Sequence, residues 1–319
     1  MKRSSRRLSA VTLAVLLTAA ACGGDSGDGD GLNGDVLIDG SSTVGPLTEV
    51  AAELFMNEEE FSNVRVTVAI SGTGGGFQKF CIGETDGNDS SRPISEEEAA
   101  LCESNDIDYD FVQFANDALT VLVNADHPAE CLTVEQVSQI WDVGSTVTTW
   151  GDVDGLDLPD DWANEPLTPY GPGTDSGTFD FFTESIMGEV GQIRNDYNDI
   201  GEDDLAAVRA IEVDRGATGY IPFSYYQEAG DAVKGLAIDG GDGCVEPTPE
   251  NVRNGTYKPL GRPLFVYFSS SALSRPEVLA FAEFYVENAL EIAELAEFVP
   301  MTAEQQEEAR QRVANLVGG

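Results

Sequence analysis

The sequence predicts an α/β fold with parallel sheets. Short apolar segments typical of strands alternate along the chain with amphipathic segments typical of helices. Three of the predicted strand-to-helix junctions are rich in glycine, serine and threonine. The chain has 319 residues, of which 41% are hydrophobic, so it can bury the core of one large domain or two smaller ones.

The chain is strongly acidic. It carries 57 Asp and Glu residues against 17 Lys and Arg residues, which gives a formal net charge of -40. A surface of this kind repels nucleic acid and anionic lipid, so no nucleic-acid partner is expected. The sequence contains no EF-hand loop, and we therefore interpret the acidic residues as a solvated surface rather than as calcium ligands.

Residues 1–21 are predicted to be a signal peptide. Basic residues precede an apolar stretch that ends in three alanines, and Cys22 follows directly. This arrangement resembles a bacterial lipobox, in which the thiol is acylated; the alternative is an ordinary secretory peptide with an incidental cysteine. Residues 22–31 are rich in Gly and Asp and are predicted to be a flexible tether. We expect an extracytoplasmic protein that reaches the cell membrane only through this lipid anchor, exported by the Sec or the Tat route.

Four cysteines lie beyond the predicted tether, and four cysteines allow three pairings. Cys81 and Cys102 are close in sequence, so we predict a disulfide between them and a second between Cys131 and Cys244. The spacing of the cysteines matches no zinc site, and the single histidine, His127, precedes a proline. The sequence therefore predicts no metal and no cofactor.

Three predicted strands each lead through a loop of glycines and hydroxyl residues into a predicted helix. At the N-terminus of a helix the unpaired backbone N–H groups and the positive end of the dipole face outward. Glycine allows close approach of a ligand, and Ser and Thr add donors, so this combination favours oxyanion binding. A single junction of this kind is an ordinary capped helix, but three at the carboxyl ends of strands indicate a site. The loops are GSSTVGP at 40–46, SGTGGGF at 71–77 and GPGTDSGT at 171–178.

Competing motifs are missing from the sequence. Residues 72–76 lack the Gly-Lys-Ser/Thr of a P-loop and the spacing of a dinucleotide-binding fingerprint. Ser176 lies in Asp-Ser-Gly rather than in a nucleophile elbow, and nothing in the sequence places His127 near it. We therefore expect a protein that is not an enzyme.

Four motifs follow one another along the chain: GSSTVGPL at 40–47, SGTGGGF at 71–77, CIGETD at 81–86 with SRPI at 91–94, and YGPGTDSGTF at 170–179. In this order they resemble the PstS family of phosphate-binding proteins. The resemblance covers nearly all of the chain after the tether, and it continues through RNDY, GYIPF and RPLFVY further along. It implies a two-lobed, periplasmic-binding-protein-like α/β fold of type II, with a ligand cleft between lobes that are joined by two crossover strands.

The resemblance also predicts how the chain divides into lobes. Two apolar runs, 118–124 and 263–268, suit the crossover strands. Lobe 1 would then consist of 32–119 plus 263–319, and lobe 2 of 120–262.

The resemblance implies that hydroxyls and amides of the three loops hold the phosphate. Two departures from better-known members concern charge: they have an aspartate where this chain has Arg92, and an arginine where it has Pro172. We expect Arg92 to supply the cation that the third loop lacks, a surface ion pair being the alternative. Arg194 is a second candidate, with a structural salt bridge as the alternative. The residues that match the family's ligands are Ser42, Thr43, Val44, Thr73, Gly74, Ser176, Gly177 and Thr178.

The missing aspartate bears on selectivity. Hydrogen phosphate carries a proton, so a buried carboxylate can accept a hydrogen bond from it. Sulfate carries no proton, so its lone pairs would face those of the carboxylate and the site would reject it. We expect Asp175 to provide this carboxylate; the alternative is an aspartate that only complements the helix dipole. Inorganic phosphate is thus the predicted ligand, with sulfate or molybdate as alternatives.

The resemblance implies the substrate-capture subunit of an ABC-type phosphate importer, a monomer that delivers its ligand to the permease subunits. Two other classes of function remain open on the same fold: a secreted phosphohydrolase, and a surface adhesin or sensor. A phosphatase assay tests the first. Phosphate uptake after deletion of the protein tests the second.

Overall fold

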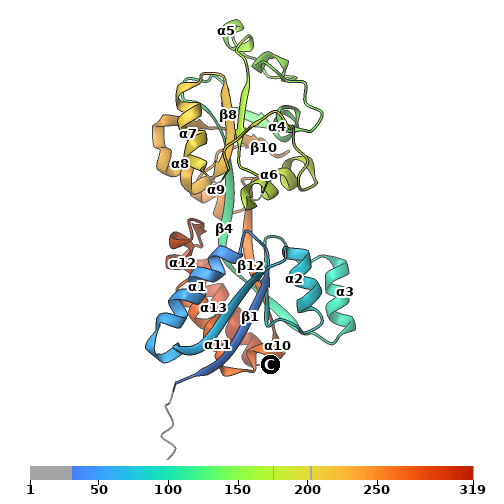
Figure 1. The fold of residues 1–319 in the computed structure, drawn as a ribbon, viewed down its shortest axis with the longest axis vertical. Helices are drawn as coiled ribbons and strands as arrows, with labels where there is room; N and C mark the ends of the chain where they lie inside the picture. Colours follow the sequence, from blue (N-terminus) through green and yellow to red (C-terminus); the bar gives the residue numbers. More distant parts are fainter. Residues whose placement is uncertain (1–30, 175, 202, 319) are drawn as a thin grey trace, which may run out of the picture. The chain divides into compact units, whose positions relative to one another are not determined.

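The computed structural model describes residues 31–174, 176–201 and 203–318. Within this part the predicted α/β class is confirmed, with strands and helices alternating along the chain. The predicted signal peptide, most of the predicted tether, Cys22 and Asp175 lie outside the described residues. Figure 1 shows the arrangement of the elements.

The first sheet is mixed rather than wholly parallel. Strand β1 (Asn33–Gly40) runs parallel to β2 (Asn63–Ile70) and to β3 (Gly87–Ser90). Strand β12 (Gly261–Ser269) is antiparallel to β3, and β4 (Tyr109–Asn124) is antiparallel to β12. The short β13 (Val299–Pro300) also pairs with β4. The antiparallel members come from distant parts of the chain, which is why local patterns did not reveal them.

Both faces of this sheet are covered, because successive side chains of a strand point to opposite sides. In β12, Leu264 and Val266 join a core with α1 (Gly45–Asn57) and α11 (Pro276–Glu287). The alternating Phe265 and Tyr267 pack instead with residues of α2 (Thr73–Phe80) and with the disulfide to α3 (Glu96–Ser104). Figure 1 shows α1 and α11 on one side of the strands and α2 and α3 on the other. The same lobe contains α10 (Ser270–Leu273), α12 (Ala289–Leu295) and α13 (Ala303–Gly318).

The second sheet begins with the second half of β4. Strand β8 (Ala217–Pro222) pairs with it in antiparallel orientation, as does β9 (Val233–Gly235). Strand β6 (Thr168–Gly171) is parallel to β8, and β7 (Asn198–Asp199) is parallel to β6. The helices of this lobe are α4 (Val134–Trp141), α5 (Asp160–Ala163), α6 (Gly177–Met187), α7 (Asp204–Val213), α8 (Phe223–Ala229) and α9 (Pro249–Arg253).

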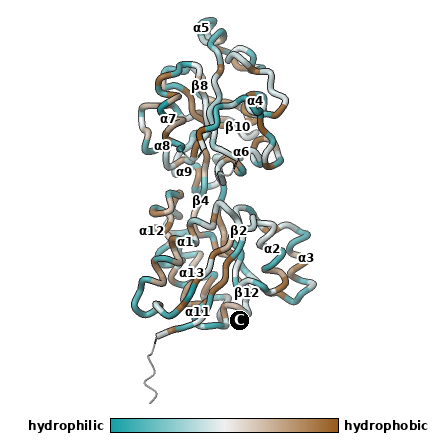
Figure 2. Tube along the Cα trace, viewed as in Figure 1, coloured by the Kyte–Doolittle hydropathy of each residue, from teal (hydrophilic) through white to brown (hydrophobic). Residues whose placement is uncertain are grey.

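A separate small sheet lies in the same lobe. It consists of β5 (Cys131–Thr133), β10 (Ala237–Asp239) and β11 (Cys244–Val245). Three short 3-10 helices complete the elements, at Glu59–Phe61, Trp150–Asp152 and Gly230–Ala232. In Figure 2 the strands carry much of the hydrophobic colour and many loops and outer helices are hydrophilic, as expected for buried sheets covered by amphipathic helices.

Two lobes share the strand β4. Residues up to Ala118 pair with β12 in the first sheet, and those from Leu119 pair with β8 in the second. The two-lobed fold is therefore confirmed. The two apolar runs predicted as crossovers lie in β4 and β12, although their pairing places 118–124 mostly in the second sheet and 263–268 in the first. The residue boundaries of the lobes stay a prediction.

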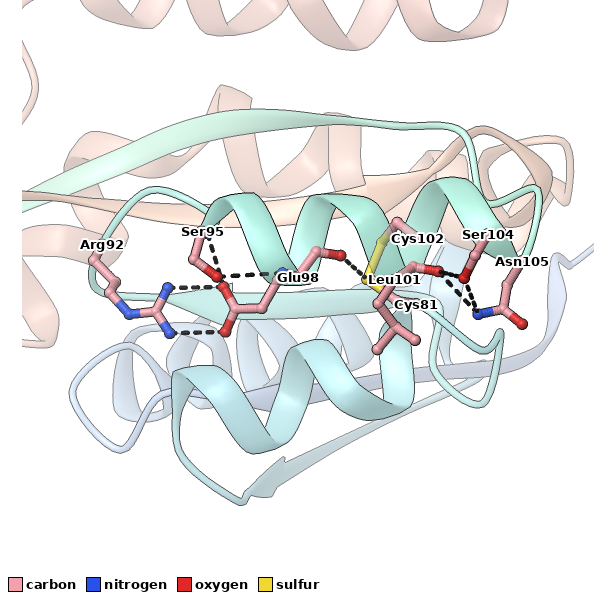
Figure 3. Close-up of a disulfide and its surroundings, with 8 residues drawn as sticks. All are labelled: Cys81, Arg92, Ser95, Glu98, Leu101, Cys102, Ser104 and Asn105. Atoms are coloured by element: carbon pink, nitrogen blue, oxygen red, sulfur yellow. Dashed lines mark hydrogen bonds and ion pairs between the residues drawn. A yellow bond between two sulfur atoms is a disulfide. The ribbon is translucent and has the colours of Figure 1, made fainter.

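Both predicted disulfides are present in the structure. Cys81 and Cys102 join the end of α2 to α3, with Cα atoms 4.2 Å apart (Figure 3). Cys131 and Cys244 join β5 to β11, with Cα atoms 6.0 Å apart. Each disulfide thus lies within one lobe. Among the described residues, no helix combines the length and the apolar character needed to cross a bilayer.

Candidate functional site

The predicted loop at 40–46, which we call the first anion loop, connects β1 to α1. Gly40 ends β1 with φ +142, and a Cβ at this position would lie 2.2 Å from the Asp89 carbonyl oxygen, so only glycine fits. The Ser41 hydroxyl accepts hydrogen bonds from the backbone N–H groups of Thr43 at 3.2 Å and of Val44 at 3.4 Å. Ser41 therefore satisfies two backbone N–H groups directly before α1.

The predicted loop at 71–77, which we call the second anion loop, connects β2 to α2 and includes the first turn of that helix. Gly72 has φ +77 and directly precedes the helix. The Thr73 hydroxyl accepts a hydrogen bond from the Ser91 N–H at 3.3 Å, so this loop is tied to the segment that follows β3. Gly76 allows a close approach: a Cβ there would lie 2.6 Å from the Cα of Gly40. The glycines of this loop thus bring α2 against the end of β1.

The third anion loop is the predicted loop at 171–178, and it leads into α6, one of the helices of the second lobe. Ser176 caps this helix, and its hydroxyl accepts from the Thr178 N–H at 3.2 Å. A Cβ at Gly177 would lie 3.6 Å from the Thr43 hydroxyl oxygen, so the start of α6 meets the first anion loop. Two helix N-termini from different lobes therefore lie beside each other, an arrangement suited to an anion.

Two cavities adjoin this meeting point, and Ser42 and Thr43 line both. Cavity A has a volume of about 200 Å³ and includes the third anion loop. Cavity B has a volume of about 210 Å³ and includes the second anion loop. Besides Ser42 and Thr43, cavity A is lined by Pro46, Asn116, Asp117, Ala118, Ser176, Gly177, Thr178, Pro222, Phe223, Ser224, Tyr225, Ala296, Glu297, Phe298 and Val299. Cavity B is lined by Ser41, Gly72, Thr73, Gly74, Ser91, Arg92, Asp180, Phe181, Glu184, Val190 and Arg262.

Val44 and Arg194 line neither cavity. Val44 is fully buried in the core of the first lobe. The guanidinium of Arg194 donates to the Asp196 carboxylate at 2.6 and 3.0 Å and to the carbonyl oxygens of Ile140 and Val147 at 2.9 and 3.2 Å. These contacts match the salt-bridge alternative: Arg194 ties loops of the second lobe together, and the structure does not bring it to the site.

Arg92 lines cavity B, but its guanidinium is already engaged. Its two Nη atoms donate to the two carboxylate oxygens of Glu98 at 2.9 and 2.8 Å, a bidentate pair (Figure 3). Glu98 also accepts from the Ser95 N–H at 2.9 Å as part of the capping box that begins α3. Burial raises the pKa of Glu98, but the hydrogen bonds from Arg92 and Ser95 outweigh burial and lower it.

Arg262, which the sequence analysis did not single out, is the buried cation of the site. Its side chain is 13% exposed. Its Nη2 donates to the Thr43 hydroxyl at 2.9 Å, and Nε and Nη2 both approach a carboxylate oxygen of Asp117 at 3.3 Å. Its Cζ lies 3.4 Å from the ring centroid of Phe181, a residue of α6. One guanidinium thus contacts the first anion loop, strand β4 and helix α6 of the second lobe.

Carboxylates surround this cation. Burial raises the pKa of Asp117, although the charge and hydrogen bonds of Arg262 oppose this. Asp180 and Glu184 project from α6 into cavity B, and burial together with the charge of Glu184 raises the pKa of Asp180. The anion site therefore combines helix N-termini and one buried arginine with an acidic border.

Among the described residues, no histidine or cysteine lines either cavity. The described residues contain no cluster of three or more His, Cys, Asp or Glu side chains that could hold a metal ion. His127 packs between Trp150 and Trp162, with ring centroids 4.2 and 4.8 Å away, and burial lowers its pKa to about 4. It lines neither cavity, so it is a core residue of the second lobe.

Comparisons with known proteins agree with this geometry. A family model described as a PBP superfamily domain matches residues 23–289. The phosphate-binding protein PstS of Staphylococcus saprophyticus is 33% identical over 312 residues, which cover 97% of this chain and 93% of that protein. The chain belongs to the PstS family.

Two further proteins are similar to this chain over most of its length. Protein SphX of Synechococcus elongatus is 41% identical over 280 residues, which cover 87% of this chain and 80% of SphX. The crystal structure of a possible phosphate binding protein from Planctomyces limnophilus superposes with a TM-score of 0.82 at 40% identity, covering 90% of this chain and 99% of that one. The PstS family is a class of substrate-binding proteins rather than of enzymes.

Proposed function

We propose that this protein captures inorganic phosphate outside the cytoplasm and delivers it to the permease subunits of an ABC importer. One observation carries the proposal: the N-termini of α1 and α6 meet where Thr43 approaches Gly177, beside the buried Arg262. An anion at this point would receive hydroxyl and amide donors from two lobes and a positive charge from the arginine. The printed name of the Staphylococcus saprophyticus relative supports phosphate as the ligand.

The second anion loop completes the proposed site. Thr73 and Gly74 line cavity B, whereas Ser176, Gly177 and Thr178 line cavity A, and the phosphate would lie where the two cavities share Ser42 and Thr43. We propose that movement of the lobes about β4 and β12 brings all three loops onto the ion. Arg262 joins the predicted ligands, and Arg92 contributes if the ion draws it away from Glu98.

Selectivity for phosphate over other oxyanions is proposed to rest on Asp117. This residue lines cavity A together with Ser42 and Thr43, and its side chain is 9% exposed. Its carboxylate can accept the proton of hydrogen phosphate in a hydrogen bond, whereas sulfate would present only lone pairs to it. Asp117 would thus take the role that we assigned to Asp175, which lies outside the described residues.

The remaining parts of the proposal concern the membrane anchor, the extent of the two lobes and binding without catalysis. Acylation of Cys22 would anchor a monomer to the membrane through the tether, with lobe 1 at 32–119 plus 263–319 and lobe 2 at 120–262. The family's role as a class of substrate-binding proteins argues for binding without catalysis. Substitution of Cys22 by alanine should release the protein from the membrane fraction, and a colorimetric phosphatase assay should show no turnover.

Titration calorimetry with phosphate, sulfate and molybdate tests the ligand. We expect phosphate to bind with the highest affinity and Arg262→Gln to weaken it. A protein that takes up no phosphate at about millimolar concentration, where binding is worth about 4 kcal/mol, would contradict the proposal.

A further inference from the structure

Asp39 is a buried carboxylate that directly precedes the first anion loop. It is 3% exposed and lines neither cavity A nor cavity B. Its Oδ1 accepts from the Gly40 N–H at 2.7 Å and from the Ser71 hydroxyl at 2.7 Å. Gly40 is the first residue of the first anion loop, and Ser71 is the first residue of the second. One oxygen of Asp39 therefore joins the starts of two loops that follow different strands, β1 and β2.

Lys79 of α2 pairs with the other carboxylate oxygen of Asp39. Burial raises the pKa of Asp39, but the hydrogen bonds from Lys79 and from the two loop residues outweigh burial and lower it. The carboxylate is therefore charged at neutral pH, and the ammonium group of Lys79 offsets that charge. Since Lys79 lies in the last turn of α2, the pair also holds this helix against the end of β1.

A charged carboxylate behind an anion site has a cost that calls for a function. Its negative charge opposes the binding of an anion, and burial removes its hydration. The backbone already joins the two loops, because the Ser71 N–H donates to the Gly40 carbonyl oxygen at 3.1 Å. The Asp39 side chain adds two further hydrogen bonds at the same junction. Its contribution is thus to fix the distance and the orientation of one loop relative to the other.

We propose that Asp39 is a positioning residue for the anion site: its carboxylate aligns the first and second anion loops so that the donors of both face the same ion. An anion site depends on this alignment, because hydrogen bonds weaken steeply when a donor is displaced or turned. The inference rests on the proposed function, since binding of phosphate is its readout. Loss of the acceptor should lower the affinity for phosphate although Asp39 and Ser71 line neither cavity.

Two double variants separate the hydrogen bonds of Asp39 from its charge. Asp39→Asn with Lys79→Met keeps an oxygen that can accept from both loops, whereas Asp39→Ala with Lys79→Met has none. Both lack the ion pair and keep the net charge of the wild-type chain. Titration calorimetry with inorganic phosphate measures the affinities. We expect the asparagine variant to bind within about threefold of the wild type and the alanine variant about tenfold to a hundredfold more weakly, as for lost residues that orient metal ligands.

Two single variants separate positioning from folding. Ser71→Ala removes one donor to Asp39 at an exposed residue and should weaken phosphate about threefold or more. Asp86→Ala is the matched control, because Asp86 accepts from the Leu37 N–H at 2.9 Å and pairs with Arg275 at 2.6 Å. Asp86 lies in the same lobe and lines neither cavity, so its loss should lower the free energy of unfolding in urea and leave the affinity for phosphate unchanged.

The results distinguish this inference from the proposed function. Equal affinities of the asparagine and alanine double variants would overturn the inference, because these proteins differ in the acceptor. An unchanged affinity in Ser71→Ala would overturn it too, even if the alanine double variant does not fold. An equal loss in Asp86→Ala would assign the effect to general destabilisation. In each of these cases the proposed function stands as long as the wild type binds phosphate; a wild type that binds none ends both.

Discussion

Arg262 and Asp117 lie directly opposite each other in the pairing of β12 with β4, and their side chains approach to 3.3 Å. The pair sits where β4 passes from the first sheet to the second. Both side chains are largely buried, so removal of one partner leaves an uncompensated charge in a dry environment. Any variant at this pair therefore needs a stability measurement beside its binding measurement.

Arg262→Gln should weaken phosphate binding by about tenfold to a hundredfold. The substitution keeps a polar side chain near Thr43 but removes the positive charge, and a hydrogen bond to a charged group is worth about 1.5–3 kcal/mol. Titration calorimetry measures the affinity, and thermal unfolding confirms that the variant is folded at the working temperature.

Arg92→Gln is the matched comparison. Because the Arg92 guanidinium is paired with Glu98, we expect this variant to lose less affinity than Arg262→Gln. A larger loss in Arg92→Gln would mean that Arg92 leaves Glu98 to bind the ion, as the sequence analysis predicted.

Asp117→Asn should narrow the preference for phosphate over sulfate by about tenfold or more. The wild-type carboxylate accepts the proton of hydrogen phosphate, whereas the amide of asparagine can donate to either anion. The affinities for both anions are measured side by side. Asp180→Asn, which changes a carboxylate of cavity B, should shift both affinities alike. An unchanged ratio in Asp117→Asn would remove Asp117 from the account of selectivity.

Local sequence patterns were enough to predict the three anion loops and the elements that flank them. Gly40 and Gly72 stand at backbone positions that favour glycine, and α1, α2 and α6 begin inside the loops predicted at 40–46, 71–77 and 171–178. The same patterns also carried the family resemblance. These features depend on residues close together in the chain, which is why the sequence displays them.

The Arg262–Asp117 pair depends on contacts between distant residues and was missed. The only local signal is a charged residue in each of two apolar strands, and the pairing of β4 with β12 is needed to see that the charges meet. Arg92 shows the opposite case. Ser95 and Glu98 have the spacing of a capping box, so Glu98 is a partner for Arg92 that lies close to it in the sequence.

Asp89 should make the protein less stable as the pH rises. Its carboxyl is fully buried, accepts from the Thr48 hydroxyl at 2.8 Å, and has its pKa raised by burial from 3.8 to about 8. The folded chain therefore holds a proton that the unfolded chain releases above its ordinary pKa. The stabilisation that the Asp89 proton provides is complete below the ordinary pKa of 3.8, and it is lost progressively as the pH rises toward 8.

Asp89→Asn tests this directly, since asparagine imitates the neutral carboxyl and does not ionise. Urea unfolding of both proteins between about pH 5 and pH 8.5 gives the difference in the free energy of unfolding. We expect the free energy of unfolding of the variant, relative to that of the wild type, to rise by a few kcal/mol between about pH 5 and pH 8.5. Parallel curves for the two proteins would show that Asp89 does not change its protonation on folding.

Loss of the Cys131–Cys244 disulfide should destabilise the protein more than loss of Cys81–Cys102. The two bonds span 113 and 21 residues of the chain. In the chain-entropy description, a longer closed loop restricts the unfolded state more, by roughly 5 against roughly 3 kcal/mol. Paired Cys→Ala variants, compared by urea unfolding under identical conditions, measure the two costs. The opposite order would indicate that packing around the buried Cys81–Cys102 bond outweighs loop length.

Salt should accelerate phosphate capture and barely change its affinity. The net charge of -40 repels a dianion at long range, and this repulsion is screened as the Debye length falls from about 30 Å at 0.01 M salt to about 8 Å at 0.15 M. The contacts that hold the ion act over hydrogen-bond distances between the lobes, where screening is weak. Stopped-flow association in sodium chloride, which avoids a competing oxyanion, gives the rate constant, and calorimetry gives the affinity. Slower capture at higher salt would mean that the local field of Arg262 and the helix N-termini already attracts the ion from solution and overrides the charge of the whole chain.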